Sequence, residues 1–145
     1  MAAGTSPIFV TTPRRPQGRV STANTNRDGT GTLATICTAG ANGDLYRRVR
    51  IMPEVAITAG DVVRLFNQVG GSGNFELIAE ITIPPQNLVT SGAGTPPTPV
   101  LQPVYWQEDP NDPTLPLILG AADVFKASTD QGKTYSIALL GGGSY

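Results

Sequence analysis

The sequence predicts an all-β protein, a single-domain antiparallel β-sandwich, and three observations support this. The chain has 145 residues, the length of one domain that can bury a core without a metal or a disulfide. It contains 17 glycines and 13 prolines and only 14% charged residues, which suits short strands joined by turns. Alternating apolar and polar runs recur between turn-forming residues, as expected for about eight strands in a jelly roll.

Residues 1–19 are expected to form an extended N-terminal arm, followed by the sandwich domain at residues 20–145. Pro13 and Pro16 keep the backbone extended and exclude the segment from the middle of a sheet. A frayed terminus is the alternative. The candidate partner-binding residues are three apolar and three basic side chains, Ile8, Phe9, Val10, Arg14, Arg15 and Arg19.

The next strands are expected from residues 20, 33 and 45 onward, separated by the turn-forming stretches 24–31 and 39–43. Asn42-Gly43 is a strong hairpin signal. The strand at 45–52 is expected to place Leu45, Val49 and Ile51 on its inner face and Tyr46, Arg48 and Arg50 on its outer face. Arg47 interrupts this alternation, which suggests an edge where its guanidinium reaches water.

Residues 62–83 form the clearest element, a β-hairpin. Its second strand alternates apolar residues at 75, 77, 79, 81 and 83 with polar residues that include Glu76 and Glu80, and its first strand alternates Val63, Leu65 and Val69 with Arg64. The glycine-rich tip at 70–74 can adopt the positive φ angles of a tight reversal. We interpret the hairpin as scaffold, with Arg64 and Glu80 exposed.

Residues 84–103 are rich in proline and glycine and form a long connection. A crossover between the two sheets of the sandwich explains such a segment, and a loop that touches a neighbouring subunit is the alternative. Later strands are expected at 104–106, 115–119, 124–127 and 135–140, the last of them ended by three glycines at 141–143.

Five segments, in order along the chain, carry a family resemblance: ANTNRDGTGTL (23–33), TAGANG (38–43), RVRI (48–51), VRLF (63–66) and KAST (126–129). They resemble small tailed-phage virion proteins of the head decoration or cement type, which are β-sandwiches. The resemblance covers about residues 20–83 and 115–143, and the 84–103 insert departs from it. It implies a structural protein on the capsid exterior, made in the host cytoplasm. Its partners would be the major capsid protein and its own copies, as a trimer or dimer.

Charge is distributed unevenly along the chain. Residues 1–50 carry a balance of +5 and residues 65–145 a balance of −5, within a net charge of −1. This favours contacts between copies over nucleic-acid binding, although chance clustering on a solvated surface is equally compatible. No apolar run approaches the roughly 20 residues that span a bilayer, so no membrane partner or signal peptide is expected.

Enzymatic chemistry is not expected. The chain has no histidine, so it lacks the base of a Ser-His-Asp or Cys-His arrangement and the imidazole ligand of many metal sites. Its one cysteine, Cys37, lies in an apolar run and is expected to be buried. Two Asx-rich loops, at 26–28 and 108–112, lack the complete ligand spacing of a calcium loop. We therefore expect no cofactor and no metal.

A second hypothesis is a carbohydrate-binding module associated with a phage tail or fibre. Jelly rolls include lectins, and Tyr105, Trp106 and Asp109 place two aromatic rings beside an acid. Against it, adjacent strand residues face opposite sides of a sheet, so one ring would lie in the core.

Overall fold

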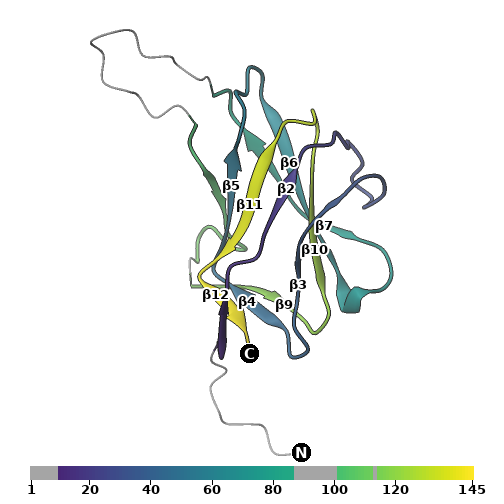
Figure 1. The fold of residues 1–145 in the computed structure, drawn as a ribbon, viewed down its shortest axis with the longest axis vertical. Coiled ribbons are helices and arrows are strands. Elements are labelled where there is room, and N and C mark those ends of the chain that lie inside the picture. Colours follow the sequence, from purple (N-terminus) through teal and green to yellow (C-terminus); the bar gives the residue numbers. More distant parts are fainter. Residues whose placement is uncertain (1–9, 87–100, 113) are drawn as a thin grey trace, which may run out of the picture.

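In the computed structural model the chain forms a sandwich of antiparallel sheets, which confirms the predicted fold class (Figure 1). The structure describes residues 10–86, 101–112 and 114–145. The elements are β1 (Thr12–Arg14), β2 (Gln17–Val20), β3 (Ala34–Thr38), β4 (Asp44–Tyr46), β5 (Arg48–Pro53), β6 (Asp61–Gln68), the 3₁₀ turn η1 (Val69–Gly71), β7 (Glu76–Ile83), β8 (Val104–Trp106), β9 (Leu117–Leu119), β10 (Val124–Thr129), β11 (Tyr135–Leu140) and β12 (Gly142–Ser144).

The strands build two layers. One sheet has the order β3-β10-β6-β7, and the other has the order β2-β11-β5-β8. A third group, β1-β12-β4-β9, extends the second sheet, because β1, β12 and β4 are joined to β2, β11 and β5 by one or two residues. Hydrogen bonds continue through the joint, where Arg47 N donates to Leu140 O and Leu139 N donates to Pro16 O, both at 3.0 Å. The second layer is therefore one long, bent sheet.

The pairing is nested, as the predicted jelly roll requires. β2 pairs with β11, β3 with β10, β5 with β8 and β6 with β7, all antiparallel. Such nesting describes one long hairpin that has rolled up until its strands alternate between two sheets. The proline-rich connection joins β7 in one sheet to β8 in the other. Its ends are tied together, since Gln102 N donates to Gln86 Oε1 at 2.7 Å and Gln86 Nε2 donates to Gln102 O at 3.3 Å.

The core lies between the layers. Alternate residues of each strand point inward, and the largest fully buried side chains include two tyrosines, two phenylalanines and several leucines and isoleucines. Burial of each such aliphatic or aromatic side chain contributes about 1.5–3 kcal/mol. The inward residues of the central strands are Val63, Leu65, Phe125, Ala127, Val49, Ile51, Tyr135, Ile137 and Leu139.

The bend in the second sheet changes which side chains face the core. Tyr46 is fully buried and Leu45 is only half-buried, the opposite of the predicted faces. Arg47 lies between β4 and β5 as an extra residue, so the alternation restarts at Arg48, and Val49 and Ile51 face the core as predicted. A single residue outside the ladder is enough to invert every side chain on one side of it.

Arg64 of β6 was expected to be exposed, and this is wrong. It is 3% exposed, and its guanidinium pairs with Glu80 at 2.7 Å and with Asp130 at 2.6 Å. The 24–32 loop lies over this side of the sheet. Asn24 N donates to Thr129 O at 2.8 Å, and Arg27 of the same loop pairs with Glu80 at 2.8 Å.

The strand predicted at 135–140 does end at Leu140, before the three glycines, but it is not the last strand as expected. Gly141 has a φ of 75° at the bend, and the chain then continues as β12 between β1 and β4. A Cβ on Gly142 would lie 1.6 Å from Leu45 O, and one on Gly143 would lie 2.0 Å from Thr12 O. These glycines are therefore required by the close approach of neighbouring backbones.

Candidate interaction surfaces

A buried polar cluster surrounds the carboxylate of Asp44. Its oxygens accept from Ser144 Oγ and Tyr46 OH at 2.7 Å each, from Arg14 Nη1 at 3.0 Å and from Gly40 N at 3.2 Å. Burial alone would raise the pKa of Asp44, but these hydrogen bonds and the charge of Arg14 outweigh it and lower the pKa. The carboxylate is therefore charged at neutral pH, with its hydrogen-bonding capacity used inside the fold.

Cys37 lies beside this cluster, with Sγ 3.6 Å from Asp44 Oδ2. Burial raises the pKa of the Cys37 thiol to about 11. A nucleophilic cysteine needs the thiolate, which is scarce at neutral pH when the pKa is this high. The cluster stabilises the junction of β1, β4 and β12. The charge of Arg14 favours the Cys37 thiolate, but burial outweighs it and Cys37 remains a thiol.

A second buried carboxylate, Asp61, connects β6 to the β10–β11 connection. Thr129 Oγ1 donates to Asp61 Oδ2 at 2.6 Å, Tyr135 OH donates to the same oxygen at 2.9 Å, and Gln131 N donates to Oδ1 at 3.1 Å. Burial raises the pKa of Tyr135, and so does its bond to Asp61. Like Asp44, this group is occupied by internal contacts.

The structure separates the six residues predicted on the arm. Ile8 and Phe9 lie outside the described residues, and Val10 is half-buried at the start of the described chain. Arg14 belongs to β1 and pairs with buried Asp44. Arg19 belongs to β2 and pairs with Glu54 at 2.7 Å, whereas Arg15 is exposed and makes no ion pair within the described residues.

The expected domain boundary at residue 20 is therefore corrected. β1 pairs with β12 and β2 pairs with β11, so residues from Thr12 onward belong to the sandwich. The prolines do have the predicted effect, because both strands lie at sheet edges, where a missing N–H disrupts no inner ladder. Sequence reasoning missed the pairing because the apolar alternation that marks a strand is absent from residues 12–19.

The residues of the glycan hypothesis do not form a platform. Tyr105 is 48% exposed on β8, while its neighbour Trp106 packs against the core. Asp109 lies in a turn, where its carboxylate accepts from Asn111 N at 2.8 Å. The one exposed ring, Tyr105, is covered on one face by the guanidinium of Arg48, whose carbon lies 4.9 Å from the ring centre.

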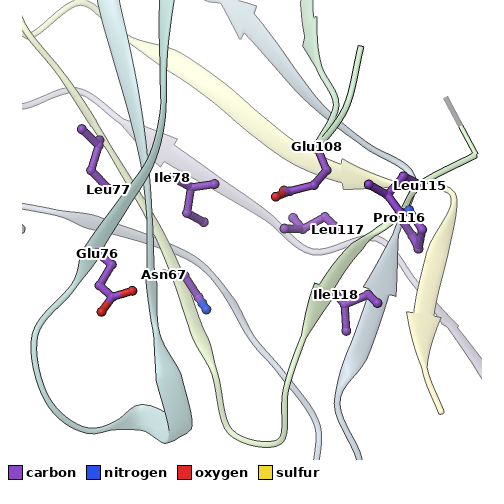
Figure 2. Close-up of a pocket in the computed structure, with 9 residues that line it drawn as sticks. All are labelled: Asn67, Glu76, Leu77, Ile78, Glu108, Leu115, Pro116, Leu117 and Ile118. Atoms are coloured by element: carbon purple, nitrogen blue, oxygen red, sulfur yellow. The ribbon is translucent and has the colours of Figure 1, made fainter. Parts of the chain in front are cut away.

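An apolar groove with acidic rims lies between β7 and β9, the edge strands of the two layers. Figure 2 shows the side chains of β7 and Asn67 on one side and those of residues 108 and 115–118 on the other. The groove has a volume of about 440 Å³. Leu77, Leu115 and Ile118 are among the exposed large apolar side chains, at 36%, 45% and 59%. Glu76 and Glu108 supply the charge, and we call this surface the acidic groove.

A basic hollow lies on the outer side of the bent sheet, at the bend. It is lined by Arg47, Arg48, Gln107, Leu140 and Gly141 and has a volume of about 290 Å³. Both arginines are exposed. Arg50, two residues beyond Arg48 on the same face, has a buried Nε with no hydrogen-bond partner in the described structure. We call this surface the basic hollow.

Neither surface was predicted as a site. The groove combines residues from β6 and β7 with residues thirty or more positions later, and no local pattern connects them. For the hollow there was a signal, because Arg47 interrupts the alternation of its strand. A charged residue that interrupts the alternation indicates a bend where a long side chain leaves the sheet. At Arg47 this bend is also where the basic hollow lies.

The chain matches no protein-family model and no curated protein. Within the described ranges, no three or more acidic or cysteine side chains are grouped to hold a metal ion. No helix in that part of the chain is long and apolar enough to cross a membrane.

Proposed function

We propose that this protein is a non-enzymatic virion structural protein that binds the outer surface of a tailed-phage capsid and stabilises it. It would be made in the host cytoplasm and would act on the capsid exterior, with the major capsid protein and its own copies as partners. The resemblance carried by residues 20–83 and 115–143 suggests this partner class.

The observation that carries the proposal is the contrast between the interior and the surface. The buried polar groups Asp44 and Asp61 are occupied by internal hydrogen bonds, whereas large apolar side chains are exposed along the β7–β9 side. Contiguous exposed apolar surface rimmed by charge is typical of protein-binding sites. Repetition over a symmetric shell would convert weak contacts of this kind into avidity.

The residues of the arm that we propose to bind the shell are fewer than the six predicted from the sequence. Residues 1–10 include Ile8, Phe9 and Val10 and precede the first strand, and Arg15 is the predicted arginine that is exposed without an ion pair within the described ranges. Arg14 and Arg19 have internal partners, so their substitution would mix loss of stability with loss of binding.

Co-sedimentation with empty capsids tests the proposal. The shells should be assembled from the major capsid protein of the phage that would encode this chain. We expect the full chain to sediment with them, and we expect a deletion of residues 1–9 combined with Arg15→Glu to remain folded and stay in the supernatant. Lys133→Glu is the charge-matched control and should bind normally.

One result would contradict the proposed function, and a second would contradict the arm contact. One is a full chain that ignores capsids while a glycan array retains it, which would favour the carbohydrate-binding alternative centred on Tyr105. The other is a deletion variant that binds shells as well as the full chain, which would move the contact away from the arm.

A further inference from the structure

The acidic groove and the basic hollow are neighbours on one side of the molecule. Gln107 lines the hollow, and the next residue, Glu108, lines the groove. The segment that follows β8 thus separates two surfaces of opposite charge. The other side of the sandwich is closed, because β2 and β3 approach so closely that a Cβ on Gly18 would lie 2.7 Å from both Thr35 O and Ile36 Cδ1.

The charged groups of the two surfaces are free to bind a partner. Within the described residues, none of Glu76, Glu108, Arg47 and Arg48 takes part in an ion pair. Arg48 is also held in place, since it stacks on the ring of Tyr105. A guanidinium positioned in this way loses less conformational freedom when it pairs with a carboxylate.

We propose that two copies of this chain form a two-fold symmetric dimer in which the acidic groove of each copy binds the basic hollow of the other. In a two-fold interface, if residue i of one copy contacts residue j of its partner, then j also contacts i. Two complementary surfaces that lie side by side satisfy this condition when the symmetry axis passes near residues 107–108. Both contacts then form in one step.

The charges favour this arrangement over others between copies. Groove against groove would oppose Glu76 and Glu108 to themselves, and hollow against hollow would oppose arginines. Groove against hollow pairs carboxylates with guanidinium groups and covers Leu77, Leu115 and Ile118, which are exposed in the single chain. Arginine binds carboxylates well in such interfaces because its planar fork can donate two parallel hydrogen bonds.

The inference deepens the self-association in the proposed function, and its test needs no capsid. Sedimentation equilibrium of the full chain should show a monomer–dimer equilibrium that weakens as salt is raised, because partly exposed ion pairs are screened. Arg47→Glu/Arg48→Glu should weaken the dimer about tenfold or more, since each substitution acts twice in a two-fold interface. Glu76→Lys/Glu108→Lys should have the same effect.

Mixing the two double variants provides the decisive measurement. Each alone presents like charges on both surfaces, but together they restore opposite charges at both contacts, so a mixed dimer should form with affinity near that of the full chain. Lys133→Glu lies in the β10–β11 connection, at the far end of β10 from β9, and should leave the dimer unchanged. If a reversal variant fails to melt cooperatively, Arg48→Gln and Glu108→Gln replace it, and each should weaken the dimer severalfold.

A full chain that remains monomeric at all concentrations would overturn the inference. So would reversal variants that dimerise normally, or a mixture that fails to associate. Capsid co-sedimentation is scored separately. A monomer that binds shells would contradict the proposed dimer and leave the proposed function standing. A dimer that does not bind shells would contradict the proposed function and leave the dimer standing.

Discussion

Asp44→Asn should destabilise the protein by about 3 kcal/mol. The side chain accepts hydrogen bonds on both oxygens, from Arg14, Tyr46, Ser144 and Gly40. In the least costly orientation the new amide NH₂ replaces Oδ1, and Ser144 can rotate to accept from it. Gly40 N then loses its acceptor, at about 1 kcal/mol, and the bonds to Arg14 and Tyr46 lose their charge, at about 1 kcal/mol each.

Urea unfolding and thermal melting measure this effect. For a chain of this length, about 3 kcal/mol corresponds to a fall in Tm of about 10 °C. Asp112→Asn is the control, because within the described residues its carboxylate accepts only from Thr114, in an exposed turn, and asparagine can still do so. This control should lie within about 0.5 kcal/mol of the unmodified protein.

The pH dependence gives a second, independent check. The folded-state pKa of Asp44 is lowered, so its contribution is complete above the unfolded pKa of about 3.9 and is lost as pH falls through the folded pKa. The stability gap between the two proteins should be constant from pH 8 to about pH 5 and should narrow below about pH 4. A gap under about 1 kcal/mol at pH 7, or one that persists at low pH, would refute this account of the cluster.

Two further predictions concern buried groups. Tyr135→Phe removes one of the two hydroxyl bonds to Asp61 Oδ2 and should cost about 1.5–3 kcal/mol in urea unfolding, whereas Tyr105→Phe, at an exposed ring, should cost less than about 0.5 kcal/mol. Equal costs would mean that the Tyr135 hydroxyl contributes nothing specific. Cys37 should resist a thiol reagent at pH 7.5 in the native protein and react fully in denaturant, because burial raises its pKa to about 11. Rapid native labelling would contradict its burial.

Alternation and turn chemistry predicted the central strands correctly. The hairpin of β6 and β7 lies where its alternating residues indicated. Asn42-Gly43 does lie in a turn between β3 and β4, but these strands belong to different sheets, so the expected hairpin is wrong. Both signals depend on residues close together in the sequence, so they can be read without knowing the fold. The sandwich followed from the spacing of such segments, although the described residues form twelve strands where about eight were expected.

The errors lie where distant segments meet. Nothing local in residues 12–19 indicates that they pair with β11 and β12, near the far end of the chain. Arg64 looks like an outward-facing residue until loop 24–32 lies over it and its partners Glu80 and Asp130 are in place. In the sequence, Val69 continues the alternation of β6. In the structure the chain turns at this residue and leaves its side chain 66% exposed.

The Gln86–Gln102 contact has a consequence for how this protein can vary. Gln86 and Gln102 lie on either side of the proline-rich segment and hold each other through two hydrogen bonds, while Gln86 is also bridged to Ile57. Insertions, deletions or sequence drift between these points need not alter the positions of β7 and β8. Evolution can therefore change the length of this segment, and any specificity that it carries, independently of the stability of the domain.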